Sequence, residues 1–280
     1  MTITWKVPGF ADLTLDDTNG MRVQSLNVGA PTTRGVSSDL PLADGTDDTT
    51  TYVGARAVSI GILLRASTGR TRLQNRDALA QRCHPGLRGE LVYDADLLCV
   101  DGSTRRILVR ADQVSAPVDN PISTAVQVTL IGYTGLIEAI TATVLDVPPL
   151  PAAEGAEFDW EWPVVWPEAA PEPTTATSAG TMAAWPTIRI DGPCAGPAVW
   201  CGDKVLSFPG FEVEAGHFLL IDSAARTVLL DGVTDRRSAL DAAVSSWWQI
   251  QPGDNDVMFV PERSGSPSTV TVTWRDAFFL

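Results

Sequence analysis

The sequence predicts an all-β protein with one helix packed on the N-terminal sheet. Short runs rich in Val, Ile and Leu recur along the 280 residues, and Gly, Pro, Asp and Asn separate them. In the first half, a single stretch at 69–86 has helical rather than alternating spacing. The proline-rich segment 145–158 is typical of a stiff connector. We therefore expect two β domains, residues 1–148 and residues 149–280.

Eight runs carry the strand prediction, four in each domain. They are "MRVQSLNV" (21–28), "ARAVSIGILLR" (55–65), "RRILVRADQV" (105–114), "TAVQVTLIGYT" (124–134), "GHFLLIDS" (216–223), "RTVLLDG" (226–232), "DVMFVPE" (256–262) and "TVTVTWRD" (269–276). The segment 167–186 is expected to be a long connection between strands of the second domain.

The expected helix lies near residues 70–83. Leu73, Ala80 and Cys83 can share one face there while the arginines point to solvent, and Pro85 ends the run. The stretch 235–246 fits either a short second helix or a loop with one turn. The polar segment 31–52 fits either a flexible hairpin tip or an arm that orders against a neighbouring subunit.

The net charge of −14 is concentrated in the second half. Residues 1–148 hold 13 Lys or Arg against 16 Asp or Glu, a net −3, and residues 149–280 hold 7 against 18, a net −11. No basic residue occurs between Arg110 and Arg189. Tight nucleic-acid binding draws on clustered Lys and Arg, so we expect none.

We expect the chain to fold in a cytosol, without a cleaved signal and without membrane insertion. No run approaches the ~18 apolar residues of a membrane helix, and "MTITWKVPGF" has neither a basic nor an apolar signal region. A hydrophobic content of 44% suffices for a packed core. The cysteines form no C-x-x-C pair; Cys194 and Cys201 could close a hairpin disulfide, but in this compartment we favour buried thiols.

His217, Asp222 and Ser223 are residues of the three types that form a Ser-His-Asp catalytic triad. In a strand, His217 and Asp222 lie ~16 Å apart on opposite faces, because each residue rises ~3.3 Å and side chains alternate. Ser223 begins a turn and lacks the G-x-S-x-G setting of a nucleophile. The other histidine, His84, stands alone at the helix end. We predict no catalytic, metal or cofactor site.

Two further patterns favour structural roles. Asp159 and Glu161 would lie about 6.6 Å apart on one face of a strand, near glycosidase spacing, but a solvated outer face gives the same letters. Eight of the nine tryptophans fall after residue 159, and we favour core packing for them. Of the adjacent pair Trp247 and Trp248, at most one can enter the core, so the other is a candidate exposed aromatic contact.

The order of motifs in the second half resembles a known family. The runs "WPTIRIDGPCAGPAVW", "LSFPGFEVEAGHFLLIDSAARTVLLDG", "WWQIQPGDNDVMFV" and "STVTVTWRDAFFL" are similar to the C-terminal galectin-like domain of distal tail proteins from long-tailed (siphovirus-type) bacteriophages. In the first half, "LVYDADLLCVDGSTRRILVRADQVSAP" and the helix before it look like the ring-forming domain of that family. The resemblance implies a tail-tube-like split β-barrel or sandwich followed by a galectin-like β-sandwich.

The resemblance also implies a structural role at the tail tip of the virion. It implies a homohexameric ring, assembled in the host cytoplasm, that joins the tail tube protein to the tip or baseplate hub protein and leaves a channel for DNA. It implies no enzyme activity and no cofactor. The segment with Arg34, Asp39, Asp44, Asp47 and Asp48 then becomes a candidate inter-subunit or channel loop.

Two other functions stay open at this point. A galectin-like domain could be a carbohydrate-binding module that recognises the host surface through Trp247 or Trp248. A glycosidase that uses Asp159 and Glu161 is the more distant alternative.

Overall fold

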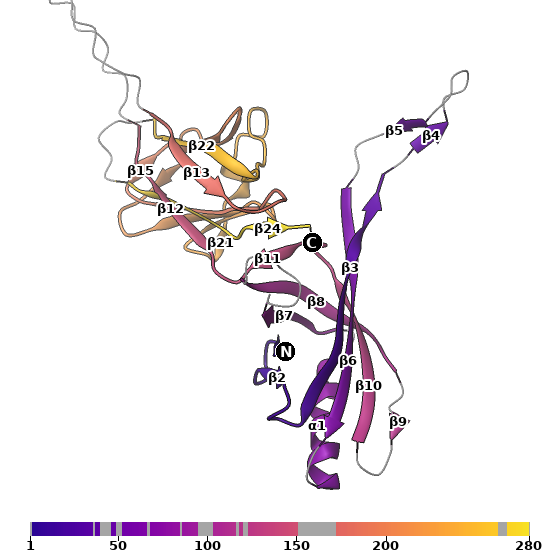
Figure 1. The fold of residues 1–280 in the computed structure, drawn as a ribbon. Helices are drawn as coiled ribbons and strands as arrows, with labels where there is room; N and C mark the ends of the chain where they lie inside the picture. Colours follow the sequence, from indigo (N-terminus) through magenta and orange to yellow (C-terminus); the bar gives the residue numbers. More distant parts are fainter. Residues whose placement is uncertain are drawn as a thin grey trace, which may run out of the picture. The chain divides into compact units, whose positions relative to one another are not determined.

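The fold is that of a computed structural model, and it consists of two compact units (Figure 1). The structure describes residues 2–35, 37–39, 46–48, 52–65, 68–84, 86–94, 103–115, 118–119, 123–150, 172–262 and 268–279. Unit 1 contains Met1–Ile140 and Ala277–Leu280, and unit 2 contains Thr141–Asp276. The chain therefore passes from unit 1 to unit 2 and returns for its last residues.

Unit 1 is built on an antiparallel sheet of ten strands among the described residues. The main order is β2-β1-β7-β8-β10-β6-β3; β9 pairs with β10, β11 pairs with β8, and β24 pairs with β11. The strands are β1 (Ile3–Lys6), β2 (Leu13–Leu15), β3 (Met21–Arg34), β6 (Tyr52–Arg65), β7 (Arg88–Asp94), β8 (Thr104–Val114), β9 (Val118–Asp119), β10 (Ser123–Gly132), β11 (Ile137–Ala139) and β24 (Ala277–Phe278). A separate hairpin joins β4 (Ser37–Asp39) and β5 (Thr46–Asp48).

One face of this sheet forms the core of unit 1. In β6 the residues Val58, Ile60, Ile62 and Leu64 are buried, and the residues between them are at least partly exposed. This period of two is the alternation that defines a sheet with one covered face. The helix α1 (Gly69–Arg82) adds Leu79 to the same core.

The helix begins and ends with ordinary caps, but its buried face differs from the prediction. The hydroxyl of Thr68 accepts a hydrogen bond from the backbone N–H of Thr71 at the N-terminus. The buried residues are Leu79 and Arg82, whereas Leu73 is 48% exposed. Of the expected face, Cys83 packs against the core, but Leu73 and Ala80 are exposed, because Leu79 and Arg82 turn inward instead.

Unit 2 contains two larger antiparallel sheets and a short pair of strands. The first sheet has the order β12-β23-β14-β19-β20-β21, the second has the order β13-β22-β16-β17, and β15 pairs with β18. The strands are β12 (Thr143–Val147), β13 (Thr174–Ser178), β14 (Thr187–Asp191), β15 (Cys194–Ala195), β16 (Ala198–Cys201), β17 (Lys204–Ser207), β18 (Glu212–Val213), β19 (Phe218–Asp222), β20 (Thr227–Leu230), β21 (Thr234–Asp235), β22 (Gly253–Val260) and β23 (Val270–Trp274).

Alternating apolar residues from both large sheets are buried in unit 2. The first sheet supplies Ile188, Ile190 and Leu219, and the second supplies Val257 and Phe259, all fully buried. The prediction of an all-β fold with one helix is thus confirmed, since α1 is the one α-helix among the described residues. The stretch 235–246 holds a single 3-10 turn, η2 (Arg237–Ala239), rather than a second helix.

Two expectations about connections need correction. The structure divides the units between Ile140 and Thr141 rather than after residue 148, because β12 pairs along its whole length with β23. The expected connector therefore begins inside unit 2, and its residues 151–158 lie outside the described chain. The expected long connection 167–186 contains a strand, β13, which pairs with β22.

Candidate assembly surfaces

A long hairpin of unit 1 extends beyond the rest of its sheet. Strands β3 and β6 pair from Met21↔Leu64 to Arg34↔Tyr52, whereas β10 accompanies β6 only as far as Arg56. Beyond Arg56 the two strands continue as a ribbon, and the β4–β5 hairpin lies between them in the chain (Figure 1). We call the part of this hairpin beyond Pro31 and Arg56, together with the segment between its two strands, the arm. Of the 22 residues in the polar segment 31–52, 11 lie in the paired strands β3, β4, β5 and β6, so this segment is not one long loop.

The predicted acidic residues lie around the far hairpin of the arm. Asp39 is in β4 opposite Thr46, and Asp47 and Asp48 are in β5 opposite Ser38 and Ser37. Asp44 lies outside the described residues, and for the other three the structure describes the backbone. Arg34 is exposed at the end of β3. The structure therefore brings Asp39, Asp47 and Asp48 into one two-stranded element.

Strand β3 is an edge strand with a broken register. Its pairing with β6 shifts between Val23 and Ser25, between Val28 and Pro31, and between Pro31 and Thr33. Within the described chain, no strand pairs with its other side. A long edge strand is a surface on which another chain can pair, and bulges and prolines limit such pairing. The residues before the second break, Met21–Val28, are thus the more regular part of this edge.

The arginines of α1 divide into surface and core residues. Arg70 is exposed, and Arg76 lies 3.7 Å from the carboxylate of Asp77. Arg82 is buried: its two terminal nitrogens donate to the carbonyls of Ala78 and Ala11, each at 2.6 Å. Burial lowers the pKa of Arg82, since a charged group loses hydration. Arg82 is a structural residue and is not available to a partner.

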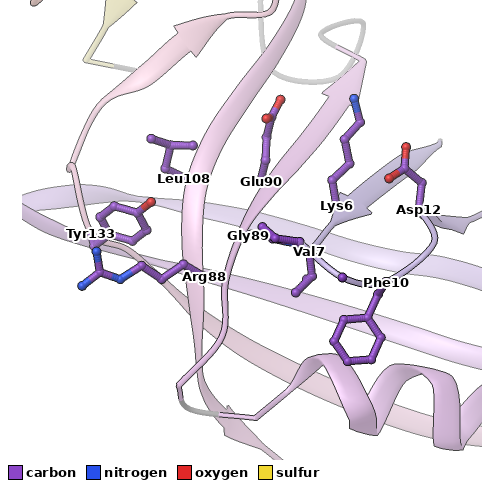
Figure 2. Close-up of a pocket in the computed structure, with 11 residues that line it drawn as sticks. Lys6, Val7, Phe10, Asp12, Arg88, Gly89, Glu90, Leu108 and Tyr133 are labelled. Carbon is purple, nitrogen blue, oxygen red and sulfur yellow. The ribbon is translucent and has the colours of Figure 1, made fainter. Parts of the chain in front are cut away.

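A groove of about 460 Å³ crosses the outer face of unit 1 (Figure 2). Lys6, Glu90 and Leu108 are neighbours across β1, β7 and β8 and form its floor. The guanidinium of Arg88 lies 5.3 Å from the ring centre of Tyr133 at one side. The groove is lined by two cations, two carboxylates and two partly exposed aromatic rings. Besides Lys6, Glu90, Leu108, Arg88 and Tyr133, the lining residues are Val7, Pro8, Gly9, Phe10, Asp12 and Gly89. Such mixed polarity fits contact with protein better than chemistry on a small substrate.

His217, Asp222 and Ser223 of unit 2 do not form a catalytic triad. Nδ1 of His217 lies 2.7 Å from Oδ2 of Asp231, across the β19–β20 hairpin, and not near Asp222. Asp222 accepts a hydrogen bond from the backbone of Ala225. Ser223 is 0% exposed, and among the described residues its hydroxyl has no hydrogen-bond partner. The sequence reasoning missed Asp231, which the hairpin register brings to His217.

The His217–Asp231 pair shifts the pKa of both groups. The hydrogen bond that His217 donates to the carboxylate of Asp231 raises the pKa of His217 and lowers the pKa of Asp231. Both groups are exposed, so the pair is a surface contact. The second oxygen of Asp231 accepts a hydrogen bond from the backbone of Phe218 and ties the two strands together.

The other candidate groups have separate positions. Cys194 and Cys201 are buried and free, and burial raises the pKa of Cys201 to about 11. The pair Asp159 and Glu161 lies outside the described residues. Across the described ranges, no three His, Cys, Asp or Glu side chains are placed to hold a metal ion. A search of the described helices finds none with the length and apolarity needed to cross a bilayer.

The tryptophans that the structure describes in unit 2 differ in burial. Trp248 is 1% exposed and Trp274 is 3% exposed, so both belong to the core. Trp247 is half-buried, and Trp185 is 38% exposed. Trp248 is therefore not an exposed contact, and Trp247 is the partly exposed member of the adjacent pair.

Comparison with known proteins finds a family domain in the second half of the chain. Residues 179–278 match the family described as "Siphovirus-type tail component, C-terminal domain". These residues form a siphovirus-type tail component domain. The domain covers most of unit 2 and the start of β24. No curated protein matches the chain.

Solved structures extend the likeness to the whole chain. The Dit (gp 19.1) protein of phage SPP1, titled "a Paradigm of Hub Adsorption Apparatus in Gram-positive Infecting Phages", is 15% identical and has a TM-score of 0.67. The match covers 99% of this chain and 100% of that one. Two phage P2 baseplate structures, activated with Ca and with Sr, give TM-scores of 0.46 at 8% and 9% identity, covering 98% and 97% of both chains. The chain thus has a distal tail protein fold, and the resemblance indicated by the motifs is confirmed.

Proposed function

We propose that this protein is a structural component of a phage tail tip, where copies of it form a hexameric ring between the tail tube protein and the hub protein. The ring leaves a channel for DNA. The observation that carries the proposal is the match to a tail component domain in a chain whose whole length has the fold of SPP1 Dit, a protein described as a paradigm of hub adsorption apparatus. The protein is then part of the virion, is assembled in the host cytoplasm and has no catalytic role.

The arm is the element of unit 1 that best suits contact between ring neighbours. Its two-stranded hairpin contains acidic residues, and at the opposite end of the β3–β6 pair Arg22 and Arg65 are exposed close to the start of α1. A head-to-tail contact of unlike surfaces closes into a ring when the rotation is right. We therefore propose that Asp39, Asp44, Asp47 and Asp48 contact the next subunit or line the channel, with Arg34 at the same end. Because residues 1–148 carry a net charge of only −3, these acids of the arm are the segment of that domain that would keep DNA in the channel from binding tightly.

Native mass spectrometry of the purified full chain tests the ring directly. We expect a species with the mass of six copies, alone or after addition of tail tube and hub proteins. A chain that stays monomeric in their presence contradicts the proposal.

A matched pair of variants tests the arm. Replacing Asp47 and Asp48 with Asn removes two acids from the arm, and replacing Asp203 and Asp256 with Asn removes two exposed acids from unit 2. We expect the first variant to weaken assembly at least about tenfold in apparent affinity, since close charge pairs across an interface couple by ~1.5 kcal/mol or more. The unit 2 variant should assemble normally. If both variants assembled with equal affinity, Asp47 and Asp48 would not contribute to the interface between subunits.

A carbohydrate-binding module is the second candidate function. Trp185 is 38% exposed and Trp247 is half-buried, and exposed aromatic rings are surfaces on which sugars stack. A glycan array with the full chain should give signals that Trp185→Ala and Trp247→Ala abolish. A silent array excludes this candidate and leaves the ring proposal untouched.

A further inference from the structure

The last residues of the chain complete unit 1. After Asp276 the chain leaves unit 2, and β24 pairs with β11 at Ile137↔Phe278 and Glu138↔Ala277. Ala277 is 1% exposed. The guanidinium of Arg105 lies 3.7 Å from the ring centre of Phe278. We call residues Ala277–Phe279 the C-terminal clip.

A buried arginine holds the end of the clip. Arg56 in β6 is 1% exposed; its Nε donates to the carbonyl of Gly135 at 2.8 Å, and its Nη2 donates to the carbonyl of Phe279 at 2.6 Å. Its Nη1 has no hydrogen-bond partner within the described part of the chain. Removal of the clip would take away one of two fixed acceptors and leave a buried cation poorly compensated.

Two glycines shape the surroundings of Arg56. A Cβ on Gly132 would lie 2.8 Å from Cγ of Arg56, so Gly132 leaves room for the aliphatic part of this side chain. Gly135 has a φ of +71°, and a Cβ there would collide with the carbonyl of Gly54, so only glycine fits where the carbonyl of residue 135 accepts from Arg56. We call the space around the Arg56 side chain, between Gly132 and the carbonyl of Gly135, the socket. In this socket Arg56 donates hydrogen bonds to two segments that are distant in the chain, one at Gly135 and one at Phe279.

The socket lies at the base of the arm. Arg56 is opposite Pro31 on β3 and opposite Gly132 on β10, and it is the last residue of β6 that β10 covers. The register of β3 breaks on both sides of Pro31 at this level. The contacts of the clip are therefore made where the arm leaves the sheet.

We propose that the C-terminal clip is a folding latch that fixes the base of the arm. Because the clip follows all of unit 2 in the chain, an incomplete chain lacks it, and the arm base then stays unfixed. If the arm makes the ring contacts proposed above, which this consequence assumes, the latch keeps incomplete chains out of the ring.

Hydrogen exchange followed by mass spectrometry tests the latch in three variants. The first ends the chain after Asp276, and the second is Arg56→Met in the full chain. The control is Arg189→Met, since Arg189 also stacks on a ring, at 3.8 Å from Phe218, but lies exposed in unit 2. We expect the first two to speed exchange at residues 53–58 and 133–136 about tenfold or more, and to leave β14 and β19 unchanged. The control should leave the arm base unchanged.

Unchanged exchange at the arm base in the shortened chain would overturn the latch. If that chain aggregates, Phe278→Ala in the full chain replaces it: this variant keeps the backbone pairing, removes the ring from Arg105, and should give an intermediate acceleration. No acceleration there would also overturn the latch. The mass of the assembled species, measured on the same samples, reports separately on the ring. Fast exchange in variants of a protein that never forms hexamers would support the latch and contradict the ring.

Discussion

The two units bury different kinds of polar groups. In unit 1 three arginines, Arg56, Arg82 and Arg105, are 7% exposed or less. In unit 2 the buried polar side chains among the described residues are neutral, namely Ser178, Ser223, Asn255 and Ser268. In unit 1, backbone carbonyls and aromatic rings thus surround buried charges, whereas the polar groups buried in unit 2 carry no charge. A lost partner should therefore destabilise unit 1 more than unit 2.

The largest effect is expected for Arg82→Met in unit 1. This change removes the two hydrogen bonds that Arg82 donates to Ala78 and Ala11 and the contact of its guanidinium with the Phe10 ring. Hydrogen bonds from charged groups contribute about 1.5–3 kcal/mol each, and Met keeps part of the apolar stem, so unit 1 should lose about 3 kcal/mol. Hydrogen exchange of β1 and β7 measures the loss. A loss below about 1 kcal/mol would mean that burial of the cation is not stabilising.

A smaller effect is expected for Asn255→Ala in unit 2. The side-chain amide donates to the carbonyls of Ala176, Gln251 and Gly253, and its Oδ1 accepts from the backbone of Gln251. Loss of these neutral bonds should destabilise unit 2 by about 2 kcal/mol. Trp fluorescence during urea unfolding follows this unit, because eight of the nine tryptophans lie after residue 159. A loss greater than that of Arg82→Met would reverse the contrast between the units.

Ser223→Ala should leave unit 2 unchanged or stabilise it by up to about 1 kcal/mol. The hydroxyl is fully buried, and no partner for it is found in the described chain, so its removal relieves an unsatisfied polar group. The same denaturation experiment measures the change. A clear destabilisation of unit 2 by Ser223→Ala would show that the hydroxyl has a hydrogen-bond partner.

The smallest effect concerns pH and the exposed pair His217 and Asp231. The pKa of His217 is raised in the folded state, so its contribution is complete below the unfolded value of about 6.5 and is lost as pH rises through the folded value. The pKa of Asp231 is lowered, so its contribution is present above about 3.9 and is lost as pH falls through the folded value. The pair thus stabilises unit 2 most between these pH values.

An NMR titration of His217 measures this effect. Asp231→Asn keeps a residue that tolerates the positive φ of 54° and should bring the pKa of His217 down towards its ordinary value. An unchanged pKa of His217 in Asp231→Asn would mean that Asp231 does not stabilise the protonated imidazole of His217.

Strands with strong alternation could be predicted, whereas elements that depend on distant contacts could not. The runs in β6, β8, β10 and β23 show period-two burial by Val, Ile and Leu, which is a local signal. Strand β13 has the sequence Thr-Thr-Ala-Thr-Ser, so pairing with β22, and not its own apolar residues, makes it a strand.

The candidate surfaces also divide into features with a local sequence signal and features that depend on contacts between distant segments. The acidic segment of the arm is visible in the composition, and so is the Trp247–Trp248 pair. The inward turn of Arg82 depends on the carbonyl of Ala11, which lies 71 positions earlier. The partner of His217 depends on the register of a hairpin, and the clip depends on a carbonyl 223 positions from Arg56. No local pattern carries such information, because each contact joins segments that only the complete fold brings together.

The register breaks of β3 also bear on how the free protein behaves at high concentration. Amyloid-like growth requires a flat strand edge on which identical chains add in register, one after another. Along β3 the pairing shifts three times within 14 residues, and Pro31 offers no backbone N–H. A short strand of a partner can pair with the free edge of β3, but the edge does not suit continuous β-sheet growth by identical chains. The breaks in β3 therefore limit the number of its residues with which an identical chain could pair in register.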